Sequence, residues 1–332
     1  MTPNILAVPE AYIIEYPTAV KFAETQEDIF WMAKEVELEK DLNDLRTNLT
    51  EAELHGVVTV LKLFTEYELK VGADYWLNKV MRMYKRPEVQ RMAASFGAIE
   101  LNVHAPFYAK INELLGLNTK EFLTSYKDDE VLTARLREIE DAVSSKGSLL
   151  DDLFSLAAFS IVEGAILYSN FAFLKHFQAE GKNKLMNLVA GINFSVRDEN
   201  LHSLGGAWLY RQTSKETTLT TKGLNDLENS IIHFASTVYQ HEYQIISKIF
   251  ERGKIPGITA HQLDNFVQSR INLCLQQLGY EPMFVVGYDP ISKWFYKNIQ
   301  SSQLHDFFQK QGNGYTRDWK EDRFNWQLAE GA

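Results

Sequence analysis

No proline occurs between Pro106 and Pro256, and this long gap limits what the chain can fold into more than any other feature. Proline removes a backbone donor and breaks helix interiors, so its absence permits several long helices in succession. We find no alternating strand pattern of useful length and no repeat of roughly 20 to 50 residues. The sequence therefore predicts a single all-α domain.

The expected helices are separated by breaks rich in glycine, lysine or threonine. Thr50 and Glu53 form a capping-box pattern at the start of the first helix, and Pro87 suits the first turn of the second. Three prolines lie within residues 1–25, which we expect to form an extended arm. The expected helices span about 50–84, 87–116, 127–146, 148–179, 182–212, 223–252 and 259–279.

Two glutamates in the expected helices, Glu163 and Glu199, indicate that a cation binds in the core. Glu163 lies in the middle of the apolar run Leu153–Phe171. A carboxylate inside a buried helix costs several kcal/mol unless a cation or hydrogen bonds compensate it. Glu199 and His202 are three residues apart and share a helix face, so they can converge on one ion. Together these residues indicate a metal site.

Two more expected helices add ligands of the same kind. One carries Glu100 and His104, and another carries Glu68. Two helices that each give one glutamate, together with two that each give a glutamate and a histidine, form the arrangement of ferritin-like dimetal-carboxylate bundles. The candidate metal ligands are Glu68, Glu100, His104, Glu163, Glu199 and His202.

The net charge and the cysteine content limit which molecules the protein can bind and in which cellular compartment it is expected. The formal net charge is -10 and no basic stripe is visible, which argues against nucleic acid. Cys274 is the single cysteine, so no intrachain disulfide can form. No apolar run reaches membrane-spanning length, and the N-terminus lacks the pattern of a secretion signal. We expect a soluble cytoplasmic protein that binds neither nucleic acid nor membrane.

The whole set of motifs resembles the small, radical-generating subunit of class I ribonucleotide reductase. The matching pieces, which span almost the whole chain, are Ile-Phe-Trp31, Glu68, His104 with Tyr108 four residues later, Glu163, Arg197-Asp198-Glu199 with His202, and an aromatic C-terminal tail. The resemblance implies a ferritin-like bundle with additional helices. It also implies a homodimer that works with a large subunit, which reduces ribonucleotides to deoxyribonucleotides.

Residue roles follow from the resemblance position by position. The six candidate ligands would hold a dinuclear metal centre that reacts with an oxygen species, and Tyr108 would store the oxidising equivalent as a radical. Trp31 and Asp198 would link the metal-bound His104 to the surface. Tyr315 would be the tail tyrosine that bridges to the large subunit.

One position departs from the family pattern. The usual spacing is Glu-x-x-His, but the residue three before His104 is Leu101, and Glu100 lies four before it. In one account Glu100 is still a ligand, because Pro106 cannot donate to the carbonyl of Asn102 and the helix widens into a π-bulge. In the other, the site has lost a carboxylate and binds metal weakly or not at all.

Two further residues depart from the family pattern, and the identity of the metals stays open. The first ligand is Glu68 where many family members have aspartate, and Ser195 stands one turn before Glu199 where an apolar residue would shield a radical. Oxygen ligands do not separate iron from manganese, so Fe/Fe, Mn/Mn and mixed Mn/Fe centres all remain open.

The last residues differ in character from the rest. In residues 303–332 glycines and charges alternate with isolated aromatics, as in a segment that folds onto a partner. We expect an arm at 1–25, a helical domain at 26–302 and a docking tail at 303–332. Two other functions stay open: a dimetal oxidase or hydroxylase with its own substrate, and a ferritin-like metal-binding protein. Neither would need the tail.

Overall fold

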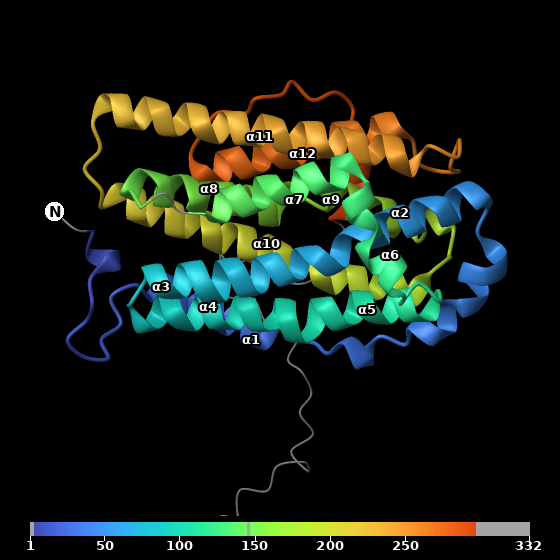
Figure 1. Cartoon of the computed structure of the whole chain (residues 1–332), viewed down its shortest axis with the longest axis horizontal. Coiled ribbons are helices and arrows are strands. Elements are labelled where there is room, and N and C mark those ends of the chain that lie inside the picture. The colour runs from blue at the N-terminus through green and yellow to red at the C-terminus, as the bar shows by residue number, and fades with distance from the viewer. Residues whose placement is uncertain (1–2, 145–146, 297–332) are drawn as a thin grey trace, which may run out of the picture.

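The structure, a computed structural model, describes residues 3–144 and 147–296, and its regular elements in these ranges are helices, as predicted (Figure 1). The α-helices are α1 (Pro17–Asp28), α2 (Glu51–Leu69), α3 (Met81–Met83), α4 (Pro87–Ile99), α5 (Ala105–Leu114), α6 (Lys120–Thr124), α7 (Glu130–Val143), α8 (Leu149–Ala165), α9 (Tyr168–Lys175), α10 (Met186–Lys215), α11 (Thr221–Ile249), α12 (Ala260–Leu278) and α13 (Pro290–Phe295). Three segments are π-helical: η4 (Asp44–Asn48), η5 (Lys70–Val80) and η6 (Glu100–His104). Short 3₁₀ turns are η1 (Asn4–Leu6), η2 (Ala33–Glu35), η3 (Leu38–Asp41), η7 (Ser125–Asp128) and η8 (Ala179–Gly181).

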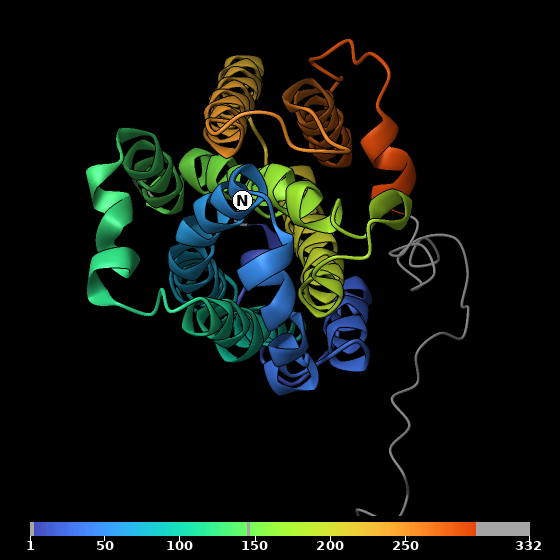
Figure 2. The same cartoon turned by 90° about the vertical axis from the view of Figure 1, so that its right-hand side faces the viewer.

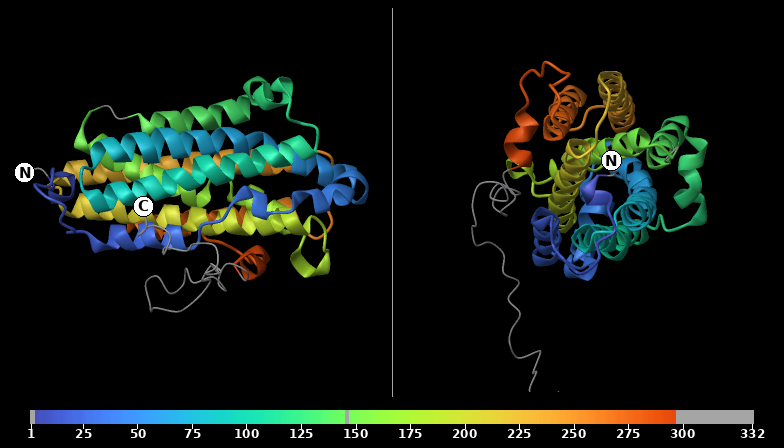
Figure 3. Two further views of the ribbon diagram at one scale, coloured as in Figure 1. Left: turned by 90° about the horizontal axis from the view of Figure 1, so that it is seen from below. Right: turned by 90° about the vertical axis from the view of Figure 1, so that its left-hand side faces the viewer.

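The long helices run along the long axis of the molecule. In Figure 1, α11 and α12 lie along one edge, α1, α4 and α5 lie along the opposite edge, and α8 and α10 lie between them. Helix α8 packs against α7, α10, α11 and α12, while α1 packs on α4 and α10. The end-on views in Figures 2 and 3 show the helices gathered around a common centre. None of the helices in the described ranges is long and apolar enough to span a bilayer, and the expected cytoplasmic location stays a prediction.

Local hydrogen bonds fix where several helices begin. The backbone N–H of Thr50 donates to the Glu53 carboxylate at 2.8 Å, and the Glu53 N–H donates to the Thr50 hydroxyl at 3.2 Å. The same reciprocal box opens α12 at Thr259 and Gln262. The cap at Thr50 and Glu53 is therefore confirmed at the residues that the sequence indicated.

The expected extended arm at residues 1–25 is wrong from residue 17 onward. Helix α1 begins at Pro17, which fits the first turn of a helix because its missing N–H would be unpaired there. Ala19, Phe22 and Ala23 are buried on one face of this helix, so burial stabilises it against the body. The expected boundary between residues 25 and 26 falls inside α1, and the expected tail at 303–332 lies outside the described residues.

A second correction concerns the expected helix at 148–179. It is interrupted after Ala165: Ile166 is extended, and Leu167 has a left-handed φ of 72°. Helix α9 then starts in a new direction. Gly164 lies two residues before Ile166, but an isolated glycine inside an apolar helical pattern is tolerated and does not by itself predict a break.

The widened turn expected between Glu100 and His104 is present as η6. It continues α4 and leads into α5, whose Pro106 cannot donate to the carbonyl of Asn102. The sequence did not indicate the longer π-helical segment η5, which packs against α4. Close approach is possible because Gly72 of η5 has no side chain: a methyl group there would lie 2.9 Å from Cβ of Glu100.

We predict that Gly72→Ala lowers the free energy of unfolding by about 1–3 kcal/mol, because overpacking forces η5 away from the neighbouring turn. Urea denaturation of the metal-free protein measures it. Gly223→Ala in the first turn of α11 is the matched control, since its nearest neighbour would lie 3.4 Å away. It should be neutral or stabilise the fold by about 0.5–1 kcal/mol. Equal stability of Gly72→Ala and the unmodified chain would contradict the close packing.

Candidate metal centre

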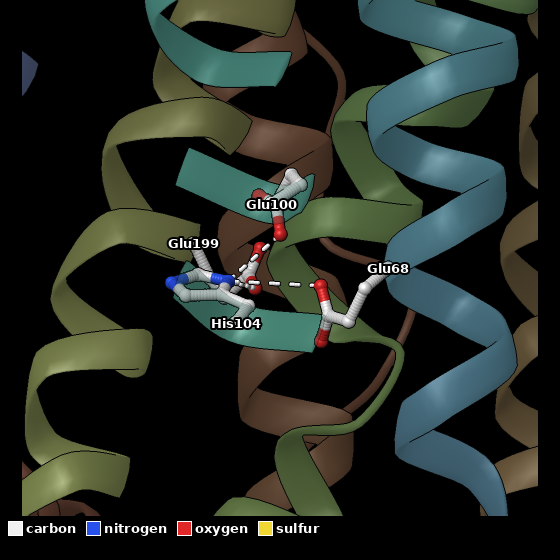
Figure 4. Close-up of side chains that lie close together, drawn as sticks. All are labelled: Glu68, Glu100, His104 and Glu199. Carbon is white, nitrogen blue, oxygen red and sulfur yellow. Dashed lines mark hydrogen bonds and ion pairs between the residues drawn. The ribbon is translucent and has the colours of Figure 1, made fainter. Parts of the chain in front are cut away.

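The six candidate ligands meet in the core, and each is at most 4% exposed. They come from the end of α2, from η6, from α8 and from the middle of α10. Figure 4 shows Glu68 reaching from α2 toward the ring of His104, with Glu100 and Glu199 beside the same ring nitrogen. The structure thus brings together residues up to about 130 positions apart, as a four-helix ligand set requires.

The ligand atoms form two overlapping groups. Glu68, Glu100, His104 and Glu199 make one group, and Glu100, Glu163, Glu199 and His202 make the other. Within each group the ligand atoms lie within 4.8 Å of one another. Glu100 and Glu199 belong to both groups. Two neighbouring ions that share two carboxylates would produce this pattern.

The first group is arranged around Nδ1 of His104. This nitrogen lies 2.7 Å from Glu100 Oε2, 3.3 Å from Glu199 Oε1 and 3.6 Å from Glu68 Oε2. Three carboxylate oxygens from three different segments therefore face one imidazole nitrogen. This first group lies nearer to Tyr108, whose ring centroid is 6.4 Å from that of His104.

The second group is arranged around Nδ1 of His202. Glu100 Oε1 lies 2.7 Å away, while oxygens of Glu163 and Glu199 each lie 3.8 Å away. The indole N–H of Trp76 donates to Glu163 Oε1 at 2.6 Å. This bond fixes one oxygen of Glu163 from outside the group.

Hydrogen bonds on the far side of each ring orient the two imidazoles. Nε2 of His104 lies 3.0 Å from Asp198 Oδ2, which also accepts the indole N–H of Trp31 at 2.8 Å. Nε2 of His202 lies 2.9 Å from Gln26 Oε1, and the Gln26 amide donates to Asp198 Oδ1 at 3.3 Å. Because these oxygens accept, each Nε2 carries a proton, which leaves each Nδ1 as the nitrogen that could offer a lone pair to an ion.

Burial and then charge repulsion raise the pKa values of three carboxyl groups in the metal-free cluster. Burial and then the charge of Glu100 raise the pKa of Glu199 to about 8. Burial and Glu100 likewise raise the pKa of Glu68, while burial and Glu199 raise that of Glu163.

The pKa values of two other members of the cluster, Glu100 and His104, shift in the direction opposite to the effect of burial. Burial opposes ionisation of Glu100, but the charge of His104 holds the pKa of that carboxyl well below its usual range. Burial also opposes protonation of His104, yet Glu100 raises the pKa of the imidazole well above its usual value. The cluster therefore needs positive charge, which protons supply when no metal is present.

The donor set fits a pair of transition-metal ions. Glu68 Oε1, Glu100 Oε1 and Nδ1 of His202 are buried and have no hydrogen-bond partner, although the last two are only 2.7 Å apart. Buried polar atoms without partners are costly, and a bound cation would satisfy all three. Carboxylate and imidazole ligands suit iron and manganese alike.

Tyr108 lies beside the first ligand group in an aromatic and apolar pocket. Its ring stacks on Phe64 at 4.3 Å, and the residue is fully buried. Burial and then the charge of Glu68 raise the pKa of the phenol, against smaller opposing effects of His104 and the Ser195 hydroxyl. The two hydroxyls, of Tyr108 and Ser195, have no hydrogen-bond partner of good geometry. The Ser195 hydroxyl therefore lies in the pocket of Tyr108, at the position where an apolar residue would shield a radical.

Two residues of the site escaped the sequence analysis, and one predicted residue cannot be placed. Gln26 and Trp76 contact the site from α1 and η5, but a lone glutamine or tryptophan carries no spacing signal, and no helix was expected in the region of α1. Tyr315 lies outside the described residues.

Comparison with known proteins gives one family model and several relatives. The model for "Ribonucleotide reductase, small chain" matches residues 10–290. The chain is 26% identical over 325 residues to a protein of Invertebrate iridescent virus 3 named "probable ribonucleoside-diphosphate reductase small subunit 048L", covering 92% of this chain and 85% of that protein. It is 23% identical to the ribonucleoside-diphosphate reductase subunit beta of Treponema pallidum, covering 92% and 86%.

Among solved structures, the dimanganese(II)-NrdF of Streptococcus sanguinis superposes with a TM-score of 0.73 at 20% identity, covering 86% of this chain and 98% of that one. A class I ribonucleotide reductase structure from Bacillus halodurans gives 0.76 at 21% identity, covering 85% and 100%. These similarities show a common fold, and the expected ferritin-like bundle is confirmed.

We predict that the metal-free protein loses stability as pH rises from about 5 to 8. In this window the folded chain keeps protons on carboxyl groups such as Glu199 that the unfolded chain, with pKa values near 4.5, has released. The raised pKa of His104 acts in the same direction above 6.5. Urea denaturation at several pH values measures the slope. Glu199→Gln should flatten it, and a free energy of unfolding that rises across the window would contradict the prediction.

Proposed function

The chain belongs to the ribonucleotide reductase small-chain family, and from this premise we propose roles for its individual residues. The protein is the radical-generating small subunit of a class I ribonucleotide reductase, and its cofactor is a dinuclear metal centre. In our proposal the ligands of that centre are Glu68, Glu100, His104, Glu163, Glu199 and His202.

One observation carries this ligand assignment. Glu100 and Glu199 each belong to both four-residue groups, so each can place one oxygen toward either of two ions. Glu68 and His104 would complete the first ion, and Glu163 and His202 the second. The displaced position of Glu100 is no obstacle in this assignment, because the widened turn η6 directs its carboxylate to both histidines at 2.7 Å.

When bound, the dinuclear centre supplies an oxidising equivalent. We propose that Tyr108 stores it by losing an electron and its phenolic proton. Glu68 is the carboxylate whose charge acts most strongly on this phenol, and we propose it as the proton acceptor. The stacked ring of Phe64 and complete burial exclude water from the phenoxyl oxygen.

For the path to the surface we propose His104, Asp198 and Trp31. Asp198 accepts from both the imidazole and the indole through the same oxygen, at 3.0 and 2.8 Å. The three side chains form a continuous hydrogen-bonded row. Asp198 holds the two protons in place, and Trp31 offers an easily oxidised ring 5.9 Å from that of His104.

The family implies a large subunit as partner. We propose that residues 303–332, with Tyr315, dock on that subunit, and that the small subunit is a homodimer. The tail lies outside the described residues, so its aromatic composition and the family support this part of the proposal.

A self-contained oxidase or hydroxylase is the alternative within the same fold. Such an enzyme needs room for a substrate beside its metals. A groove of about 870 Å³ lies between α1, α10 and α12, but its lining includes none of the six candidate ligands. The hydrogen-bonded row of His104, Asp198 and Trp31 favours transfer of the oxidising equivalent away from the metal centre. An oxidase whose substrate is bound beside the metals does not require such a path.

We predict that Glu100→Ala loses metal while Leu101→Ala keeps it. Loss of a ligand typically weakens a metal site tenfold or more, whereas the neighbouring leucine contributes packing. Metal analysis after loading and desalting should give fewer ions per chain for the first variant and an unchanged number for the second. Full occupancy in Glu100→Ala would mean that Glu100 is not a ligand.

We predict that Tyr108→Phe keeps the metals and loses the tyrosyl radical together with ribonucleotide reduction. Phenylalanine fills the same space, but it has no phenolic proton to release. Metal analysis, an electron paramagnetic resonance spectrum and a reductase assay with the large subunit measure the three properties. Full activity in this variant would place the stored oxidising equivalent elsewhere.

We predict that truncation after Gly314 abolishes reduction while metal binding and the sedimentation of a dimer stay unchanged. The tail would supply the contact with the large subunit and no ligand. Metal analysis, sedimentation velocity and the reductase assay test the three points. A monomer at micromolar concentration would exclude the homodimer, and retained oxidase turnover without the tail would favour the alternative function.

A further inference from the structure

Arg270 of α12 is buried in the core without a carboxylate partner. It is 1% exposed, and no ion pair joins its guanidinium to a carboxylate among the described residues. Burying a charge is costly unless hydrogen bonds and polarisable groups compensate it. Its contacts should therefore explain why an arginine is there.

Most of the compensation comes from a backbone carbonyl and an aromatic face. Nε and Nη2 donate to the carbonyl oxygen of Gly164 at 2.9 and 2.7 Å. The guanidinium lies 3.8 Å from the ring centroid of Tyr168, and Nη1 donates to the Tyr296 hydroxyl at 2.9 Å. A cation at the C-terminus of α8 is also favoured by the dipole of that helix.

A further bond connects the same guanidinium to α10. Nη2 donates to the side-chain oxygen of Asn200 at 3.1 Å, and the Asn200 amide donates to the carbonyl of Val196 at 2.9 Å. The second bond holds the Asn200 side chain against its own helix. Arg270 thus connects the backbone of α8 to a fixed point on α10.

Both attachment points are next to candidate ligands in the sequence. Gly164 follows Glu163, and Asn200 follows Glu199. Oxygens of both carboxylates lie 3.8 Å from Nδ1 of His202, so the two ligands face the same point. Helix α8 also ends at Ala165, so no continuing helix holds the segment that follows Glu163. The hydroxyls of Ser160 and Ser203 donate to each other's backbone carbonyls at 2.9 and 2.8 Å and join the two helices directly. Arg270 adds a second connection on the C-terminal side of Glu163, next to the end of α8.

We propose that Arg270 is a positioning residue that sets the spacing of Glu163 and Glu199 by connecting α8 to α10. The inference rests on the proposed function, because it assumes that these two carboxylates bind metal. Arg270 itself touches neither ion nor substrate. Its effect is to hold the second ligand group in a geometry that a metal ion can use without further rearrangement.

Titration of the metal-free chain with Mn(II), followed by the paramagnetic resonance signal of the free ion, tests the proposal. Arg270→Lys keeps the charge but lacks the planar guanidinium that donates to Gly164 through two nitrogens while it reaches Asn200, and we expect about tenfold weaker affinity. Asn200→Ala removes the same connection from α10 and should weaken affinity in the same direction. The double variant should bind no more weakly than Arg270→Lys alone, because the connection is already broken.

Arg86→Lys is the matched control. Arg86 is 3% exposed, donates from Nε and Nη2 to the carbonyl oxygen of Asn4 at 3.2 and 3.0 Å, and lies over the ring of Tyr16. These contacts resemble those of Arg270 but touch neither α8 nor α10. Arg86 differs from Arg270 in that it also pairs with the carboxylate of Glu15 at 3.1 Å. Arg86→Lys should lower the thermal midpoint and leave the Mn(II) affinity unchanged.

The outcomes separate this inference from the proposed function. If the unmodified chain binds no Mn(II), the ligand assignment itself is wrong. If it binds Mn(II) and Arg270→Lys binds equally well while its thermal midpoint falls, Arg270 only stabilises the fold. If the double variant loses Mn(II) affinity by the product of the two single losses, the two residues act independently and the proposal is overturned. If Arg270→Lys does not fold, Asn200→Ala decides, because alanine suits a helix and removes the acceptor together with one bond to the backbone of the same helix.

Discussion

Four glutamates enclosed in one helical core are the constraint on which the rest of this structure depends. Glu68, Glu100, Glu163 and Glu199 are each at most 4% exposed and share ligand groups with two histidines. Without a cation such a cluster can persist only by holding protons, as the raised pKa values of three of its carboxyl groups indicate. The helices are arranged to enclose this charge, and the outer contacts of Asp198, Gln26, Trp76 and Arg270 hold its members in position.

The widened turn η6 reconciles the unusual spacing of Glu100 with a six-residue ligand set. Glu100 lies four residues before His104, whereas the family pattern has the glutamate three residues before the histidine. In a regular helical turn this extra residue would change the direction of the Glu100 side chain relative to His104. The π-helical segment absorbs the extra residue, so the Glu100 carboxylate approaches both histidines. Its neighbour η5 contributes Gly72, whose missing side chain lets the two widened segments pack closely. Local backbone geometry thus compensates for a shift in the sequence.

Spacing and burial patterns could predict that the candidate ligands meet in one buried cluster, because carboxylates in apolar helical runs are rare enough to be informative. Glu163 in its apolar run and the pair of Glu199 and His202 are signals of this kind. The helix break at Leu167 was not predicted, because Gly164 stands alone in an apolar helical pattern, where a single glycine is tolerated. Gln26 and Trp76 were missed for a different reason: their contacts depend on how α1 packs and how far η5 unwinds, which are tertiary properties.

The central claim is that the displaced Glu100 bridges two metal ions. Anomalous diffraction from crystals of the Mn(II)-loaded protein tests it most directly. The account predicts two anomalous peaks per chain, with one oxygen of Glu100 within about 2.0–2.3 Å of each, the usual range for transition-metal carboxylates. A single peak, or two peaks with Glu100 bonded to neither, would contradict the account.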